Sequence, residues 1–523
     1  MNTSEFLTIA AAIVPDRRTL IFEDQEFTFA EMQDRVNQLA NSLAELGVGP
    51  RDRIATMQVN CPQLIELYFA TALLDAVYVP LNFRAKAEEL QQMLSIAQPE
   101  LLFLGERYLS LVAAGESAAP IAPDRVAVID APGTGDNLSY DSLLQASPDP
   151  LHFPEAADDD TTVIMFTAGT TGVPKGVLLT HDSFSSYLLS TVMPADPEVE
   201  ETNLLSVPLY HIAGLQAALA AIYGGRTLAV MRQFEPLEWL NVAQAHRANR
   251  AMLVPTMLKR VMDHPQFHDF DLSSLDVITY GAAPMPLPVI QQAIKEFPGV
   301  RFINAFGQTE TASTITMLPP EDHVLEGTPE EVEKKLRRLT SIGKPLEDVE
   351  VLIVDEDGNP AATGEVGEIV ARGSRMMKGY WQQETATNEA IRSGWVYTGD
   401  LAYQDEDDYI YLAGRAKDFI KRGGEMISPE EVEQVLVSHP KVEDAAVIGI
   451  PDLEWGEEVR AIIVTGSDPA TREELIEHCN QHLASFKRPR SVVFIDELPR
   501  NVMGKVLKRD LREAHGYPID SDD

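Results

Sequence analysis

The loop from Phe166 to Gly176 constrains the fold of this chain more than any other segment. It places three glycines, three threonines and one lysine between two apolar runs, residues 162–166 and 177–180, which are typical of buried strands. Glycines let the backbone approach phosphate oxygens, and the threonine hydroxyls and Lys175 add donors and positive charge. The order Pro174-Lys175-Gly176 differs from a Walker A loop. The pattern predicts a nucleotide-phosphate loop, and a threonine-rich surface hairpin is the alternative.

Size and composition predict a large folded protein. A chain of 523 residues suggests about three domain-sized units, and 45% hydrophobic residues are enough for sizeable cores. The net charge of −39 argues against nucleic-acid and anionic-membrane partners, because both need basic patches. Only Cys61 and Cys479 are present, which favours a reducing, cytoplasmic location over a disulfide framework or a cysteine metal site. No apolar run is long enough to predict a membrane span.

Helical and strand-like patterns alternate along most of the chain, which predicts an α/β fold. Residues 30–46 and 62–76 read as helices, and residues 53–58 and 77–81 as strands. The alternation continues in residues 181–190, 227–231, 236–247 and 250–254. Short strands with turn signals in residues 342–372 predict a small β-rich subdomain, and residues 329–339 predict an exposed charged helix. Ser428-Pro429 predicts the start of a helix in a new α/β unit after Gly414.

Six further motifs occur in order after the phosphate loop. They are Pro208-Leu209-Tyr210-His211, Tyr280-Gly281-Ala282-Ala283-Pro284, Asn304-Ala305-Phe306-Gly307-Gln308-Thr309-Glu310, Tyr397-Thr398-Gly399-Asp400, Gly414-Arg415-Ala416-Lys417-Asp418 and Pro499-Arg500-Asn501-Val502-Met503-Gly504-Lys505. With the loop, they resemble the adenylate-forming superfamily of acyl-CoA synthetases, peptide-synthetase adenylation domains and firefly-type luciferases. The resemblance covers nearly the whole chain.

The resemblance implies an α/β architecture with two domains. Residues 1–414 would form a large N-terminal domain, with two α/β sheets and a small β-rich subdomain, that binds ATP and the acid. Residues 415–523 would form a small mobile α+β lid that rotates between two half-reactions. Lys417 lies at the hinge position of the family.

The family chemistry implies an ATP-dependent acyl-CoA ligase. A carboxylate and ATP give an acyl-AMP and pyrophosphate, and the thiol of CoA then gives an acyl-CoA and AMP. Lys505 is the catalytic candidate for the first step, because a cation there would stabilise negative charge that develops at the α-phosphate. Lys421 matches a lysine that assists the second step in some relatives, and His211 matches a ring that gates the passage between acid and thiol. Considered alone, Lys505 would be a surface lysine and His211 a packed histidine.

The resemblance also assigns the nucleotide and its Mg²⁺. Asp400 would accept the ribose hydroxyls with help from Arg415, Phe306 would stack on adenine, and Glu310 would hold Mg²⁺. Most relatives have tyrosine at position 306 and serine at position 168, so Phe306 and Ala168 each remove one hydroxyl. The remaining ATP and AMP candidates are Thr167, Gly169, Thr170, Thr171, Gly172, Lys175, Gly281, Ala282, Ala283, Gly307, Gln308 and Thr309.

Candidates for CoA and for the acid complete the predicted site. Gly423 and Gly424 would line the pantetheine tunnel, and Phe486, Arg488 and Arg84 would contact the nucleotide end of CoA. Tyr210, Ala213, Gly214 and Ala217 would line the acyl pocket, where small side chains leave room for a long or bulky acid.

The identity of the acid and of the acceptor stays open at this stage. The absence of an aspartate near Tyr210 disfavours an amino acid, and we expect a medium- or long-chain fatty acid. An aryl or alicyclic acid, or an adenylate-former with an acceptor other than CoA, is the alternative. A non-catalytic binding module on the same scaffold is disfavoured by the presence of Lys505, Glu310 and Asp400. A homodimer is left open.

Overall fold

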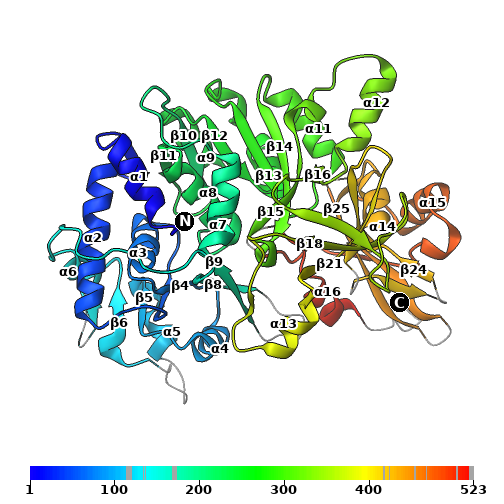
Figure 1. Cartoon of the computed structure of the whole chain (residues 1–523). Helices are drawn as coiled ribbons and strands as arrows, with labels where there is room; N and C mark the ends of the chain where they lie inside the picture. The colour runs from blue at the N-terminus through cyan, green and yellow to red at the C-terminus, as the bar shows by residue number, and fades with distance from the viewer. Residues whose placement is uncertain are drawn as a thin grey trace.

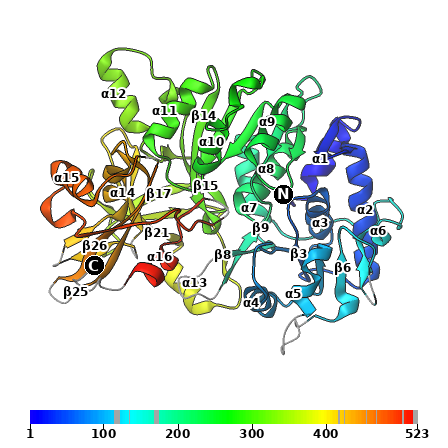
Figure 2. The same ribbon diagram turned by 180° about the vertical axis from the view of Figure 1, so that it is seen from behind.

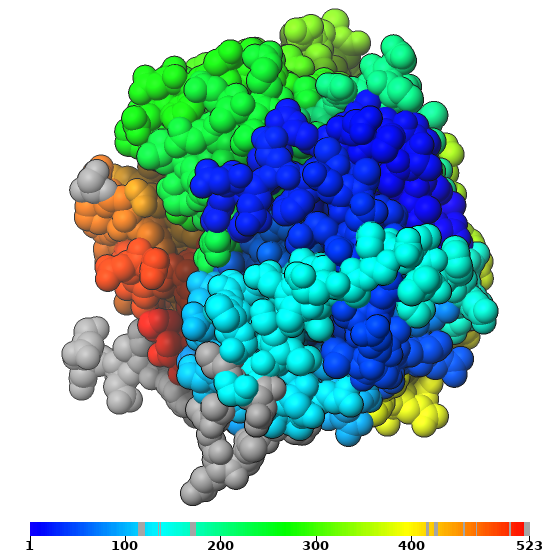
Figure 3. All heavy atoms as spheres, turned by 90° about the vertical axis from the view of Figure 1, so that its left-hand side faces the viewer, coloured from blue at the N-terminus to red at the C-terminus, as the bar shows by residue number. Residues whose placement is uncertain are grey.

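Four β-sheets organise the chain in a computed structural model, which describes residues 1–113, 121–133, 135, 137–167, 174–415, 418–422, 425–452, 455–466, 468–501 and 504–516. Figures 1 and 2 show the blue and cyan N-terminal elements at one end of the molecule and the orange and red C-terminal elements at the other. The space-filling view in Figure 3 shows the C-terminal elements lying directly beside the N-terminal part. The predicted α/β class with a large N-terminal and a smaller C-terminal domain is confirmed.

An eight-stranded sheet carries the phosphate loop. Its strand order is β19 (Gly379–Tyr380), β9 (Lys175–Thr180), β8 (Thr161–Thr167), β4 (Val77–Pro80), β3 (Arg53–Met57), β5 (Leu101–Leu104), β6 (Val126–Val128) and β7 (Leu138–Ser139). The strands from β8 to β7 run parallel, and β9 and β19 add an antiparallel edge. The helices of this region are α2 (Phe29–Glu45), α3 (Pro62–Leu73), α4 (Ala87–Ala97), α5 (Leu109–Ala113) and α6 (Tyr140–Leu143).

A nine-stranded sheet carries the predicted adenine segment. Its order is β16 (Lys344–Pro345), β15 (Ser313–Leu318), β14 (Arg301–Gln308), β13 (Val277–Gly281), β12 (Arg250–Leu253), β10 (Thr202–Leu205), β11 (Thr227–Val230), β1 (Arg18–Phe22) and β2 (Gln25–Thr28). Its helices are α1 (Glu5–Ile13), α7 (His181–Thr191), α8 (Ile212–Tyr223), α9 (Pro236–Ala245), α10 (Pro255–Met262), α11 (Leu287–Glu296) and α12 (Pro329–Arg338).

Two five-stranded sheets complete the fold. The first contains β17 (Glu350–Val354), β18 (Gly367–Arg372), β21 (Trp395–Gln404), β20 (Ile391–Arg392) and β22 (Ile410–Arg415), with α13 (Glu384–Ala390) beside it. The second contains β24 (Glu425–Ile427), β23 (Ile420–Arg422), β26 (Gly456–Thr465), β25 (Val442–Asp452) and β27 (Ser491–Phe494), with α14 (Pro429–Val437), α15 (Arg472–His482) and α16 (Lys508–His515). The predicted domain boundary after residue 414 falls one residue before β22 ends, and it stays a prediction.

Local sequence signals explain where several helices begin. Thr28 caps α2 by accepting a hydrogen bond from the Glu31 backbone, and the Glu31 carboxylate accepts one from the Thr28 backbone N–H. Ser428 caps α14 as predicted, because its hydroxyl accepts from the Glu431 backbone. The predicted charged helix is α12, which has no buried residue. None of the described helices is both long enough and apolar enough to cross a bilayer.

A buried ion pair joins three helices in the N-terminal core. Glu66 of α3 is fully buried, and Arg35 of α2 donates to its two carboxylate oxygens at 2.7 and 3.1 Å. The hydroxyl of Tyr140, in α6, donates a short hydrogen bond to the same carboxylate. A buried carboxylate needs both partners, because an unpaired charge away from water is costly. The cluster therefore fixes how α2, α3 and α6 pack.

Replacing the buried carboxylate should destabilise this region strongly. We expect Glu66→Ala to lower the free energy of unfolding by about 3–5 kcal/mol, because it leaves the Arg35 guanidinium without its counter-charge. Calorimetric unfolding measures the effect. The matched control is Glu26→Ala, which removes an exposed ion pair with Arg18 and should cost less than about 1 kcal/mol. Equal losses of unfolding free energy in the two variants would contradict a stabilising role for the buried Glu66–Arg35 pair.

Candidate active site

The two strands that flank the predicted phosphate loop form an antiparallel pair. Thr167, at the end of β8, lies opposite Lys175, at the start of β9. Four of the predicted phosphate ligands, Gly169, Thr170, Thr171 and Gly172, lie outside the described residues, as does Ala168. The loop therefore begins and ends at adjacent points, which a phosphate cradle requires.

Tyr380 joins the phosphate loop to the predicted magnesium ligand. It lies in β19, which pairs with β9, so its ring lies 4.6 Å from the Lys175 ammonium. Its hydroxyl donates to Glu310 Oε1 at 3.1 Å. Sequence reasoning missed Tyr380, because it lies about 200 residues from Lys175 and only the pairing of β19 with β9 brings them together. The available sequence signal for this residue was the pair Gly379-Tyr380, a glycine followed by a tyrosine in a short strand.

A tight hairpin presents the residues from Phe306 to Glu310. Strand β14 ends at Gln308, a 3₁₀ helix η4 (Thr309–Thr311) follows, and β15 returns antiparallel. A side chain at Gly307 would collide with the Ser313 carbonyl, so only glycine fits. Ala312 and Ser313 have positive φ angles of 48° and 84°, which non-glycine residues rarely adopt. Such local strain is found at functional sites, where the surrounding structure imposes it.

The predicted adenine segment lies beside this hairpin. Gly281 of β13 pairs with Ala305 of β14, and a side chain at Gly281 would collide with the Ala305 carbonyl. Ala282 follows with a positive φ of 64°. The backbone of Gly281, Ala282 and Ala283 therefore leaves its strand next to Phe306, as an adenine site between them requires.

The predicted ribose ligands occupy paired backbone positions on neighbouring strands of a third sheet. Asp400 of β21 lies opposite Arg415 of β22, and Asp400 is only 6% exposed. The backbone N–H of Asp400 donates to the Thr398 hydroxyl at 3.1 Å. The Gln308 side-chain amide donates to the Thr398 carbonyl at 3.2 Å. The ribose hairpin is thereby linked to the end of β14.

His211 is the N-cap residue of helix α8, and its ring packs against neighbouring aromatic rings. The ring lies 4.3 Å from the Tyr210 ring, and Phe83 packs edge-on against Tyr210 at 5.4 Å. Its Nε2 atom is buried and has no hydrogen-bond partner among the described residues. Burial lowers the pKa of His211 to about 4, so the ring is neutral at pH 7. Burial also raises the pKa of Tyr210.

Three of the predicted acyl-pocket residues lie on α8, and they differ in burial. Ala213 and Ala217 lie one turn apart on a half-buried face of the helix. Gly214 is buried, and a side chain there would collide with the Pro208 carbonyl. The glycine at position 214 is therefore needed for close packing of the helix start, in addition to any role in making room for the acid.

The Lys505 loop of the lid contacts the large domain. Gly504 has a φ of 73°, and a side chain there would collide with Thr256 in α10. The Lys505 backbone N–H donates to Asn501 Oδ1 at 2.9 Å, and the Lys505 side chain is exposed. Lys505 is thereby placed at the boundary between the lid and the large domain.

The other lid candidates are only partly described. Lys421, in β23, is exposed, and Phe486 is half-buried against the lid core. Arg488 donates to the carbonyls of Leu483 and Asn480, so its guanidinium is engaged with the end of α15. Lys417, Gly423, Gly424 and the side chain of Arg415 lie outside the described residues. Arg84, on the large domain, is exposed, and its guanidinium lies 5.6 Å from the Phe83 ring.

The described residues contain no group of three or more His, Cys, Asp or Glu that could hold a metal ion. Glu310 therefore belongs to no such cluster, and it contacts Tyr380, whose ring lies beside Lys175. That donor set fits Mg²⁺, which binds through one or two carboxylates together with substrate phosphates.

Family comparisons agree with this geometry over almost the whole chain. Residues 7–381 match the AMP-binding enzyme family, and residues 431–505 match the AMP-binding enzyme C-terminal domain. The chain belongs to the AMP-binding enzyme family. The predicted membership of the adenylate-forming superfamily is confirmed, and the protein is an AMP-forming ligase.

The relatives of this chain are named for different acids. The chain is 35% identical to a feruloyl-CoA synthase of Amycolatopsis sp, over 94% of each chain. It is 32% identical to the long-chain-fatty-acid–CoA ligase FadD13 of Mycobacterium tuberculosis, over 95% of this chain and 94% of the relative. The Bacillus subtilis o-succinylbenzoate CoA synthetase, solved with its acyl-adenylate intermediate, superposes with a TM-score of 0.82 at 29% identity, over 98% of this chain and 99% of that chain.

Removing the Tyr380 hydroxyl should slow adenylation. Tyr380→Phe keeps the ring beside Lys175 but removes the hydrogen bond to Glu310, which as a bond to a charged group contributes about 1.5–3 kcal/mol. We expect pyrophosphate release to fall by about tenfold or more, with any acid that the wild type activates. Tyr403→Phe, on the neighbouring five-stranded sheet, is the control and should keep the wild-type rate. An unchanged rate in Tyr380→Phe would show that the hydroxyl does not orient Glu310.

Acid should destabilise the protein through its buried histidines. Burial lowers the pKa of His181, His211 and His323 to about 4, whereas an unfolded histidine titrates near 6.5. Between these values the unfolded chain binds more protons, so stability is complete above pH 6.5 and is lost as the pH falls towards 4. Each of the two fully buried rings, His181 and His323, should contribute about 3 kcal/mol.

Thermal unfolding between pH 7 and pH 4 measures this loss. His181→Gln should have a shallower fall in melting temperature than the wild type, and His268→Gln, at an exposed histidine, should follow the wild type. A His181→Gln curve parallel to the wild type would argue against burial as the cause.

Proposed function

We propose that this protein is an ATP-dependent acyl-CoA ligase, which joins a carboxylic acid to the thiol of CoA through an acyl-AMP. The observation that carries the proposal is the convergence of three sequence motifs on one region. Lys175 and Glu310 are joined by Tyr380, and the Glu310 hairpin is hydrogen-bonded through Gln308 to the strand that bears Asp400.

The convergence suits the needs of each part of ATP. The backbone after Gly281 and the ring of Phe306 would hold adenine, with stacking kept although the usual tyrosine hydroxyl is absent. Asp400, with Arg415, would accept the ribose hydroxyls. Lys175 and the loop of residues 166–176 would hold the departing pyrophosphate, and Thr309 would contact the α-phosphate.

Glu310 would hold Mg²⁺ together with the nucleotide phosphates, and the ion would neutralise charge on the phosphates during attack by the carboxylate. Tyr380 donates to one oxygen of Glu310, so the carboxylate is oriented before the nucleotide arrives. Lys505, from the lid, would approach the α-phosphate in the first half-reaction. Its stabilisation of the developing charge is the main catalytic contribution of the lid.

The second half-reaction would use the other face of the lid. His211 would move aside to admit the thiol once the adenylate is complete, and Lys421 would assist the transfer. Lys417 would be the hinge, and Gly423 and Gly424 would form a narrow passage for pantetheine. Phe486 and Arg84 would contact the nucleotide end of CoA, whereas Arg488 would first have to release the carbonyls of α15.

We propose a medium- or long-chain fatty acid as the substrate, supported by the fatty-acid ligase relative and by the small residues Ala213 and Ala217 on α8. An aryl acid is the second candidate, because a feruloyl-CoA synthase is 35% identical over 94% of the chain. We also propose a cytoplasmic location, supported by Cys61 and Cys479, which are both buried and free.

A substrate panel tests the proposed reaction. Fatty, aryl and alicyclic acids are each mixed with ATP and Mg²⁺, with and without CoA, and pyrophosphate and acyl products are measured by mass spectrometry. A CoA thioester that forms with one class of acid is the expected result. An acyl-AMP that accumulates without thioester for every activated acid would overturn CoA as the acceptor.

Within that panel, Lys505→Ala separates the half-reactions. We expect acyl-AMP formation to fall by about 10²–10³-fold, and thioester formation from supplied acyl-AMP to stay near the wild-type rate. The matched control is Lys421→Ala, which should have the opposite pattern. Equal losses in both half-reactions for Lys505→Ala would contradict the proposal that Lys505 serves adenylation and Lys421 serves thioester formation.

A further inference from the structure

Tyr280 lies in β13 immediately before the predicted adenine segment and fixes the position of that segment. It is fully buried in β13, directly before Gly281, Ala282 and Ala283. Its hydroxyl lies 2.8 Å from Nε2 of His323. The segment that follows Tyr280 is therefore held to a residue about 40 positions later in the chain.

The hydrogen bonds of His323 identify its tautomer. Nδ1 lies 2.9 Å from the Pro319 carbonyl oxygen, which can only accept, so Nδ1 carries the proton. Nε2 is then the acceptor for the Tyr280 hydroxyl. Burial lowers the pKa of His323 to about 4, which keeps this neutral arrangement at pH 7. The ring also packs against Phe302 of β14, with centroids 6.1 Å apart.

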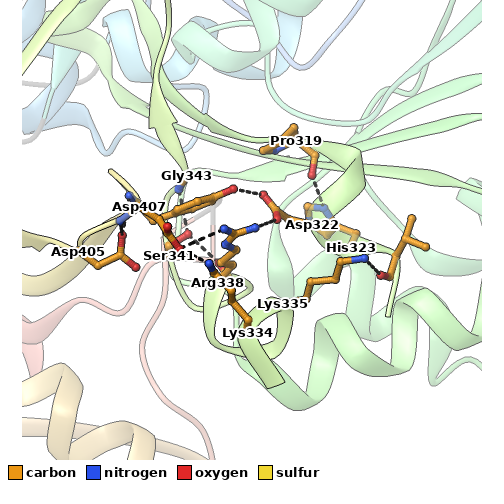
Figure 4. Close-up of polar contacts among 12 residues, drawn as sticks. Pro319, Asp322, His323, Lys334, Lys335, Arg338, Ser341, Gly343, Asp405 and Asp407 are labelled. Atoms are coloured by element: carbon orange, nitrogen blue, oxygen red, sulfur yellow. Dashed lines mark hydrogen bonds and ion pairs between the residues drawn. The ribbon is translucent and has the colours of Figure 1, made fainter. Parts of the chain in front are cut away.

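Asp322, the neighbour of His323, lies beside Arg338, as Figure 4 shows. Its carboxylate accepts from Arg338 Nη1 at 2.9 Å and from the Tyr409 hydroxyl at 2.7 Å. Tyr409 directly precedes β22, the strand that places Arg415 opposite Asp400. Asp322 is 4% exposed, so these bonds are made away from water.

The segment that follows Arg338 reinforces the same connection. The Asn304 amide of β14 donates to the Ser341 carbonyl at 3.1 Å. Ile410 is then joined to this segment by two backbone hydrogen bonds. Its carbonyl accepts from Ile342 N–H at 2.8 Å, and its N–H donates to the Gly343 carbonyl at 3.0 Å. The adenine strand and the ribose hairpin are thus joined by both side-chain and backbone bonds.

We propose that Asp322 and His323 are positioning residues for the nucleotide, which hold the adenine segment through Tyr280 and the ribose hairpin through Tyr409 and Arg338. This inference rests on the proposed nucleotide site. Neither residue would touch the nucleotide itself. Through Tyr280, Tyr409 and Arg338 they would fix the distance between the adenine and ribose contacts. A displacement of about 1 Å in such a site can cost about 10²-fold in rate.

The test is a titration of ATP with Mg²⁺ into the full chain by calorimetry, without acid or CoA. His323→Phe keeps an aromatic ring at this position and removes both hydrogen bonds, and Tyr280→Phe removes one hydroxyl. We expect Tyr280→Phe to weaken ATP binding by about 3–10-fold, the loss of one neutral hydrogen bond, and His323→Phe to weaken it at least as much, because it also removes the bond to Pro319. The double variant should be no weaker than His323→Phe, because the two residues share one interaction.

Two further variants separate positioning from general stability. Asp322→Asn should also weaken ATP binding, since it removes the charge that Arg338 and Tyr409 share. Tyr140→Phe removes a buried hydroxyl bound to Glu66 in a distant part of the core, and it should lower the melting temperature without changing ATP affinity.

Wild-type ATP affinity in folded His323→Phe would overturn the proposal. If that variant does not fold, wild-type affinity in both Tyr280→Phe and Asp322→Asn would overturn it equally. The titration needs neither acid nor thiol, so a chain that binds ATP but makes no thioester would contradict the proposed function and not this inference.

Discussion

The close approach of three backbone segments, β13, β14 and β15, is the constraint on which the candidate site depends. Gly281 packs against the Ala305 carbonyl and Gly307 against the Ser313 carbonyl, with no room for a side chain at either position. This compact arrangement turns the chain sharply after Gln308, so Phe306 and Glu310 leave the strand in fixed directions. A wider hairpin would separate the proposed adenine contact from the proposed phosphate and magnesium contacts, and the proposed adenylation geometry would be lost.

Three sheets meet at this hairpin, and each contributes a different part of the site. The eight-stranded sheet supplies Lys175 and, through its edge strand, Tyr380. The nine-stranded sheet supplies the hairpin, and the small five-stranded sheet supplies Asp400. Polar bonds from Tyr380 to Glu310 and from Gln308 to Thr398 connect the three. These bonds join the described parts of the candidate site within the protein itself.

In the proposed mechanism, the C-terminal domain and His211 are the parts that move. The loop around Gly504 touches Thr256, which places Lys505 beside the large domain, as a state that makes the adenylate would require. In the same structure the His211 ring is packed against Tyr210 with its Nε2 atom buried. A packed histidine and a Lys505 loop beside the large domain are mutually consistent under the proposed function, in which both belong to the step before the thiol enters.

The sequence by itself determined the fold class, most of the elements and the family. Local signals suffice for these features: glycine-rich turns, helix caps such as Ser428 and apolar strands such as β8 are set by neighbouring residues. The sequence also indicated Glu310 and Asp400, because they stand inside ordered motifs. Only the tertiary structure decided the roles of Tyr380, Asp322 and His323. Their partners are separated from them by up to about 200 positions, and a contact of that kind depends on strand order and helix packing, which no local pattern encodes. For the same reason the charged helix α12 looked like a solvated surface helix, although Arg338 at its end binds a buried carboxylate.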